Sequence, residues 1–128
     1  MRIIGIGTDI VQLCRIKGAV ERHGKGFAER ILHPAELTLY EAHTQPVSYL
    51  AKRFAAKEAV SKALGTGIGE QVRLTEIQTS NDIQGKPILK FHGRTEAFVR
   101  QLGVQESFIS LSDERDYAIA YVILTAHQ

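Results

Sequence analysis

The chain has 128 residues, a formal net charge of +2 and 23% charged residues, which is typical of one globular domain, here residues 1–128. Because 44% of the residues are apolar, a disordered or fibrous chain is excluded. No apolar run approaches the roughly 18 residues of a membrane helix, and the first residues lack the apolar segment of a signal peptide. With a single cysteine, Cys14, a reducing, cytoplasmic location is expected.

The predicted elements place helices first and strands mostly after them. A first strand is predicted over residues 2–8. Helices are predicted over residues 11–23, 27–32, 34–42 and 47–64, the last ending at a glycine-dense segment, residues 65–69. Strands at 74–80 and 87–92, a helix at 95–102 and strands at 107–112 and 117–125 follow. This order predicts an α+β domain with a mostly antiparallel sheet.

Glu58 is the first candidate functional residue, because of its place on the predicted helix 47–64. At about 100° per residue, Glu58 falls at the centre of an apolar stripe that includes Leu50 and Phe54. A carboxylate that faces a core is costly unless it is paired or binds a metal. The alternative is an exposed ion pair with Lys62, four residues on, which is worth about 0.2–0.5 kcal/mol.

Asp9 is the second candidate, because it follows an isoleucine-rich strand that contains Gly5 and Gly7. One interpretation is a helix N-cap for a segment that begins near Ile10. The other is a metal ligand at the end of a strand, where the glycines allow close approach. Two carboxylates from separate elements, with substrate phosphates and water, are the usual way to hold Mg²⁺.

Cations surround Glu58, as expected near a polyphosphate ligand. They are Arg53, Lys57 and Lys62, and the loop Gly65-Thr66-Gly67 follows. The loop either presents backbone N–H groups to a phosphate or only ends the helix. It is not a Walker loop, because no Lys-Ser/Thr pair follows at the required place.

The basic charge is concentrated in the first half of the chain. Residues 1–64 carry ten Lys and Arg against six Asp and Glu, and the excess is densest in residues 11–30. This segment is either a solvated helix face or a docking surface for an anionic partner. Nucleic acid is not expected, because the basic residues are not adjacent and no aromatic residues alternate with them.

Two spaced motifs, found in order, resemble those of the bacterial holo-acyl-carrier-protein synthases, which are 4′-phosphopantetheinyl transferases. The first is Gly5-Ile6-Gly7-Thr8-Asp9-Ile10 with Arg15-Ile16; the second is Phe54-Ala55-Ala56-Lys57-Glu58-Ala59 with Lys62-Ala63-Leu64-Gly65-Thr66-Gly67. The resemblance extends over essentially the whole chain. It implies a Mg²⁺-dependent transfer of 4′-phosphopantetheine from coenzyme A to a serine of apo-acyl carrier protein, with release of 3′,5′-ADP, in support of fatty acid biosynthesis.

The resemblance also implies a role for each candidate residue. Asp9 and Glu58 would bind Mg²⁺, Glu58 would be the base for the serine hydroxyl, and Lys62 would stabilise or protonate the departing phosphate. Coenzyme A would contact Arg53, Lys57, Lys62, Gly65, Thr66 and Gly67. The acidic carrier protein would dock on Arg15, Arg22, Lys25 and Phe27. Charge pairs between two proteins mainly steer their encounter and set specificity.

The family further implies a homotrimer with its sheets at the centre and active sites between neighbouring subunits. The strands 107–112 and 117–125 are apolar on much of both faces, which fits either burial against another copy or an ordinary core. One residue departs from the family pattern: Phe108 stands where many members have a histidine. Two other functions stay open, a non-catalytic basic module that binds an acidic protein or RNA, and a metal-dependent nucleotide phosphohydrolase.

Overall fold

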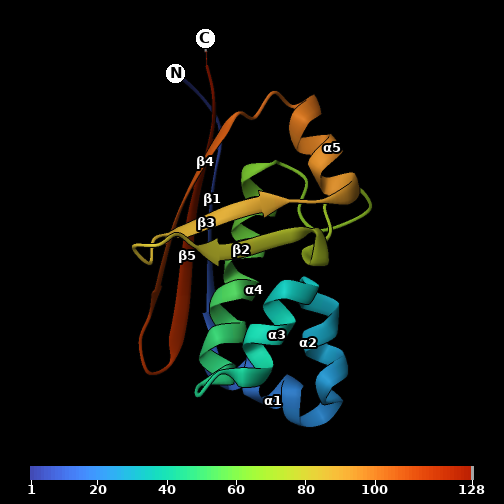
Figure 1. Cartoon of the computed structure of the whole chain (residues 1–128), viewed down its shortest axis with the longest axis vertical. Helices are drawn as coiled ribbons and strands as arrows, with labels where there is room; N and C mark the ends of the chain where they lie inside the picture. The colour runs from blue at the N-terminus through green and yellow to red at the C-terminus, as the bar shows by residue number, and fades with distance from the viewer. Residues whose placement is uncertain (128) are drawn as a thin grey trace.

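A computed structural model describes residues 1–127 (Figure 1), and Gln128, the last residue of the predicted domain, lies outside the described residues. The elements are β1 (Arg2–Gln12), α1 (Leu13–His23), α2 (Lys25–Ile31), α3 (Pro34–Ala42), α4 (Pro46–Ala63), a 3-10 helix η1 (Leu74–Glu76), β2 (Ile77–Asn81), β3 (Pro87–Phe91), α5 (Gly93–Gln101), β4 (Glu106–Asp113) and β5 (Tyr117–Ala126). The predicted α+β class and the order of its elements are confirmed.

The strands form two antiparallel sheets. The larger has the order β1-β5-β4, so that the last strand of the chain is central and pairs with β1 from Arg2 to Gln12. The smaller is the β2–β3 hairpin. Figure 1 shows the larger sheet along one side of α4, the hairpin across the helix, and α1, α2 and α3 grouped around its lower end.

Helix α4 is the centre of the molecule. Eleven of its 18 residues are buried, and it packs on both β1 and β5. The single apolar stripe that the sequence predicted is therefore too narrow: the helix is enclosed on several sides. Its many alanines permit this, because a short side chain lets neighbouring elements come close from more than one direction.

Two glycines bring the backbone of β1 directly against the backbone of α4. A Cβ atom at Gly5 would overlap the carbonyl group of Ala63, and one at Gly7 would overlap that of Ala59. We call this contact the glycine seam. Two strand residues span about 6.6 Å and four helix residues about 6 Å, so the two pairs of residues lie in register along the seam.

The two main differences from the predicted elements arise from long-range pairing. The first strand continues to Gln12, where it pairs with Tyr117 of β5, and the backbone N–H of Leu13 donates to the carbonyl of Asp116. These partners lie more than 100 residues away along the chain, so no local pattern indicated them. The second difference is that the predicted strand 74–80 begins with the 3-10 turn η1.

The outer face of the larger sheet, opposite α4, is apolar and exposed. Its exposed large side chains are Ile6, Ile10, Phe108, Tyr117, Ile119 and Tyr121. A contiguous apolar surface of this kind is typical of a site where another protein packs. Within residues 1–127, no helix combines the length and the apolar character needed to cross a membrane.

Candidate functional site

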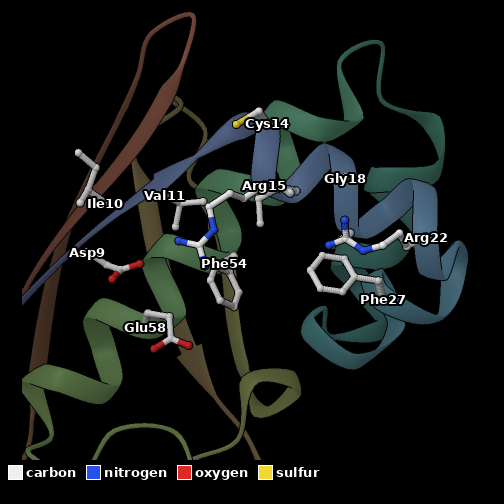
Figure 2. A pocket seen from close by; sticks show the side chains of 12 residues that line it. Asp9, Ile10, Val11, Cys14, Arg15, Gly18, Arg22, Phe27, Phe54 and Glu58 are labelled. Atoms are coloured by element: carbon white, nitrogen blue, oxygen red, sulfur yellow. The ribbon is translucent and has the colours of Figure 1, made fainter.

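A cavity of about 620 Å³ lies between β1, α1, α2 and α4 (Figure 2). Figure 2 shows the carboxylates of Asp9 and Glu58 at one end, Arg22 and Phe27 at the other, and the guanidinium of Arg15 between them. Residues that lie up to 49 positions apart in the sequence thus line one space. Both predicted metal ligands and three of the four predicted docking residues are among them.

Asp9 reaches the cavity from within β1, so the predicted alternative of a helix N-cap is wrong. Successive strand residues face opposite sides, and Asp9 therefore faces the same side as Gly5 and Gly7, toward α4. Its side chain is only 16% exposed. The glycines do allow a close approach, but the group that approaches them is the backbone of α4.

Glu58 lines the cavity from α4, one helical turn after Phe54, which lines it too. Burial raises the pKa of the Glu58 carboxyl, the nearby Asp9 carboxylate raises it further, and Lys62 partly opposes both effects. Desolvation and a second negative charge each disfavour the ionised form. A cation between the two carboxylates would relieve this cost.

Lys62 supplies a cation beside this pair of carboxylates. Its Nζ donates to the Thr8 carbonyl oxygen at 2.9 Å and to Asp9 Oδ1 at 3.0 Å. The helical alternative predicted an ion pair with Glu58, whereas the ion pair in the structure is made with Asp9. Lys62 remains half-exposed, so its ammonium is available to a ligand that enters from solvent.

The carboxylate oxygens of Asp9 and Glu58 and the Thr8 carbonyl oxygen are suited to a hard divalent cation. Carboxylate and carbonyl oxygens are the ligands that Mg²⁺ prefers. Asp9 already binds one cation in this structure, the Lys62 ammonium. Within residues 1–127, no cluster of three or more His, Cys, Asp or Glu side chains forms a metal site. The protein would thus supply two carboxylates and leave the other coordination positions to water and substrate, as is usual for Mg²⁺.

The predicted contact of Lys57 with coenzyme A is wrong. The side chain is fully buried, and its ammonium donates to Glu36 Oε1, to the Ile31 carbonyl and to the Leu74 carbonyl. All three N–H groups of the ammonium donate to acceptors within the protein, and the side chain has no exposed surface that a phosphate could contact. Its neighbour Glu58 faces the cavity instead, because adjacent helix residues point about 100° apart.

The glycine loop after α4 ends the helix and does not present free N–H groups. The backbone N–H of Gly65 donates to the carbonyl of Lys62, and those of Thr66 and Gly67 donate to the carbonyl of Ser61. Gly65 and Gly67 adopt positive φ angles of 84° and 71°, which glycine tolerates without strain. The coenzyme A contacts predicted for Gly65 and Gly67 stay predictions. A contact through the exposed Thr66 side chain stays a prediction.

Arg53 and Lys25 lie outside the cavity. Arg53 is 7% exposed and stacks over the Tyr49 ring at 4.5 Å, and its Nε finds no hydrogen-bond partner in the described part of the chain. The coenzyme A contact predicted for it remains a prediction. Lys25 is exposed and paired with Glu41 at 3.3 Å, and it does not line the cavity.

The sequence did not reveal the polar hub, by which we mean Glu36 and the groups that it binds, Lys57, His33 and Thr79. Nor did it reveal the apolar lining of the cavity. Glu36 stands at the third position of α3, where a glutamate commonly completes a capping box with the residue before the helix. It does so with His33, but its spacing gives no sign of burial against Lys57. Phe54, Val11 and Cys14 line the cavity, and the exposed Cys14 has no disulfide partner.

Comparisons with known proteins show the family of this chain. The family model of the 4′-phosphopantetheinyl transferase superfamily matches residues 5–122. A holo-[acyl-carrier-protein] synthase of Halorhodospira halophila is 52% identical over 122 residues, which are 95% of this chain and 97% of the relative. The crystal structure of a holo-[acyl-carrier-protein] synthase from Neisseria meningitidis superposes with a TM-score of 0.93 at 43% identity, over 96% of this chain and 98% of that one.

A second solved structure carries a ligand. It is a holo-(acyl-carrier-protein) synthase from Bacillus anthracis in complex with CoA (3′,5′-ADP), which superposes with a TM-score of 0.83 at 36% identity, over 99% of this chain and 100% of that one. These matches extend over nearly the whole chain and include the strand and the helix that carry the two carboxylates. The chain therefore belongs to the 4′-phosphopantetheinyl transferase superfamily, among the holo-[acyl-carrier-protein] synthases.

Proposed function

We propose that this protein transfers 4′-phosphopantetheine from coenzyme A to a serine of apo-acyl carrier protein and so supplies the holo-carrier for fatty acid biosynthesis in the cytoplasm. The observation that carries the proposal is the meeting of Asp9 and Glu58 in a cavity whose far wall is basic, with the Lys62 ammonium paired to Asp9. The relatives named above support the choice of substrates.

Asp9 and Glu58 are the residues that would hold Mg²⁺. When bound there, the ion would neutralise negative charge on the diphosphate oxygens of coenzyme A. The raised pKa of the Glu58 carboxyl and the carbonyl of Thr8, which already accepts from Lys62, both support a cation at this place.

Side chains of this protein would then accept the proton of the serine hydroxyl and stabilise the charge on the leaving phosphate. Glu58, directly or through a water, takes the proton of the serine hydroxyl, whose oxygen forms a bond to the phosphorus on the pantetheine side. The bond from this phosphorus to the oxygen of 3′,5′-ADP breaks. Lys62, which is half-exposed, stabilises or protonates the phosphate that leaves.

A mass assay tests the proposal. The protein, coenzyme A, Mg²⁺ and apo-carrier protein are incubated together, and the carrier should gain the mass of one phosphopantetheine group with release of one 3′,5′-ADP. Release of 3′,5′-ADP without the carrier would indicate a phosphohydrolase instead. Tight binding of an acidic protein or RNA without any reaction would indicate a binding module.

The basic wall of the cavity is the proposed docking surface for the acidic carrier. Arg15 and Arg22 would pair with its carboxylates, Lys25 would do so outside the cavity, and Phe27 would be an apolar anchor. Arg22→Glu should raise the KM for the carrier about tenfold or more and leave the KM for coenzyme A within twofold, since like charges repel at a docking surface. Steady-state kinetics with each substrate varied would measure this, and equal weakening of both substrates would contradict a docking role.

We further propose a homotrimer in which the outer faces of the larger sheets meet and the active sites lie between subunits. The exposed apolar side chains of that face support it, since burying them against other copies removes them from water. We expect sedimentation to give three times the monomer mass of 14.2 kDa. Ile10→Lys, which places a charge on this face opposite Ile119, should yield the monomer, and a monomeric wild-type protein would refute the assembly.

A further inference from the structure

The ammonium of Lys57 is a buried charge that the proposed reaction does not use. It is enclosed within the protein next to Glu58 in sequence, and it does not line the cavity. Its three acceptors come from three different elements: Ile31 at the end of α2 at 2.7 Å, Glu36 of α3 at 2.6 Å and Leu74 of η1 at 2.9 Å. A single side chain of α4 thus joins three segments that otherwise have few polar contacts with it.

Glu36 completes this hub. Its Oε1 accepts from the His33 backbone N–H as well as from Lys57, and its Oε2 accepts from the backbone N–H and the hydroxyl of Thr79 in β2. A buried ion pair is tolerated when its remaining hydrogen-bonding capacity is satisfied in this way. Burial lowers the pKa of Lys57 to about 8 despite the Glu36 carboxylate, and the neutral amine would still donate to a carbonyl.

The bond to Ile31 matters because of what α2 carries. This helix has only seven residues, and an isolated helix of this length is not stable in water. Two of its residues are buried, Ala28 and Ile31, and its ion pair through Lys25 is exposed and therefore weak. The carbonyl of Ile31, which α2 itself leaves unpaired as its last residue, receives the Lys57 ammonium at the negative end of the helix.

Phe27 lies one helical turn before Ile31 and lines the cavity opposite Glu58, as Figure 2 shows. Lys57 therefore links two sides of the cavity: its backbone adjoins Glu58 on α4, and its amine holds the end of the helix that carries Phe27. We propose that Lys57 is a positioning residue, which acts through Ile31 to fix the distance of the Phe27 wall from Glu58 and thereby sets the affinity for the acceptor protein. The inference rests on the proposed function, in which that wall docks the carrier.

A pair of variants tests the inference. Glu36→Gln removes the negative charge of the pair but keeps the Lys57 amine that donates to Ile31, whereas Lys57→Met with Glu36→Gln also removes the amine. Both variants carry the same glutamine in place of the Glu36 carboxylate, so the weakening of its bonds to His33 and Thr79 is common to the two. We expect the double variant to show a KM for the carrier about tenfold above that of Glu36→Gln, with the KM for coenzyme A within twofold. Hydrogen exchange of the α2 backbone amides should also be faster in the double variant, with no change in α5.

Equal carrier KM values in the two variants would overturn the inference. Phe27→Ala separates this result from a failure of the proposed function: if it leaves the carrier KM unchanged, the docking wall itself is wrong and the inference falls with it. If Phe27→Ala raises the carrier KM and the two variants are equal, the inference alone falls. Should the double variant not fold, Lys57→Leu with Glu36→Leu replaces the pair by apolar side chains, which is commonly tolerated, and the same comparison decides.

Discussion

Asp9→Asn and Glu58→Gln should each reduce transfer of phosphopantetheine to the carrier about a thousandfold or more, while the protein stays folded. Each change keeps the shape of the side chain and removes its negative charge. Charge stabilisation at a reacting phosphate is the largest single contribution that such a site makes, and loss of one preorganised group commonly costs a factor of about 100 to 1,000. Loss of a metal ligand adds to this cost. The carrier mass assay measures the turnover, and circular dichroism checks the fold.

Binding of Mn²⁺, followed by electron paramagnetic resonance without any substrate, separates the metal role from a general effect on activity. Both variants should bind the ion more weakly than the wild-type protein. Glu96→Gln is a matched control, because it also neutralises a glutamate that lies near a cation four residues on, Arg100, but on α5 and outside the cavity. Full transfer in either Asp9→Asn or Glu58→Gln would remove that residue from the reaction.

Gly7→Ala should destabilise the protein by about 3 kcal/mol or more and also abolish transfer. The added Cβ would overlap the backbone of Ala59, and a backbone cannot rotate away as a side chain can. Overpacking typically costs 1–3 kcal/mol when side chains can adjust, so a backbone clash belongs at or above the top of this range. To relieve it, β1 must move away from α4, and this movement separates Asp9 from Glu58.

Urea denaturation at equal protein concentration measures the loss of stability. Gly69→Ala is the control, because nothing lies within 4 Å of the added Cβ and the residue does not have a positive φ. It should leave the free energy of unfolding unchanged or raise it by up to about 1 kcal/mol, since alanine restricts the unfolded chain. A Gly7→Ala protein as stable as Gly69→Ala would show that the seam can open without cost.

The sequence predicted best those features that depend on local signals. The helix of residues 34–42 has the predicted bounds because Pro34 is favoured at a first helical position and cannot continue a preceding helix. Glu58 faces the same side as Phe54, as its spacing indicated. The two carboxylates that meet in the cavity were singled out through the two motifs, since each motif places a carboxylate within a recognisable run of residues.

The features that the sequence did not predict depend on contacts between distant segments. A local pattern shows that Lys57 is charged and adjoins Glu58, but its burial requires Glu36, 21 residues earlier, to arrive beside it. The N-cap interpretation of Asp9 failed because pairing with β5 extends β1 past the residue. The glycines of β1 indicated a close approach, but only the fold shows that the approaching group is a helix backbone.

The two ends of the cavity rest on different kinds of contact. Asp9 and Glu58 stand on a central strand–helix pair whose contact is main chain against main chain. Arg15, Arg22 and Phe27 stand on α1 and α2, in which Ile16, Ala28 and Ile31 are the buried residues. Under the proposed function, catalytic geometry and partner choice would rest on separate segments, so that preference among carrier proteins could diverge through residues 13–31 while the reaction centre stays unchanged.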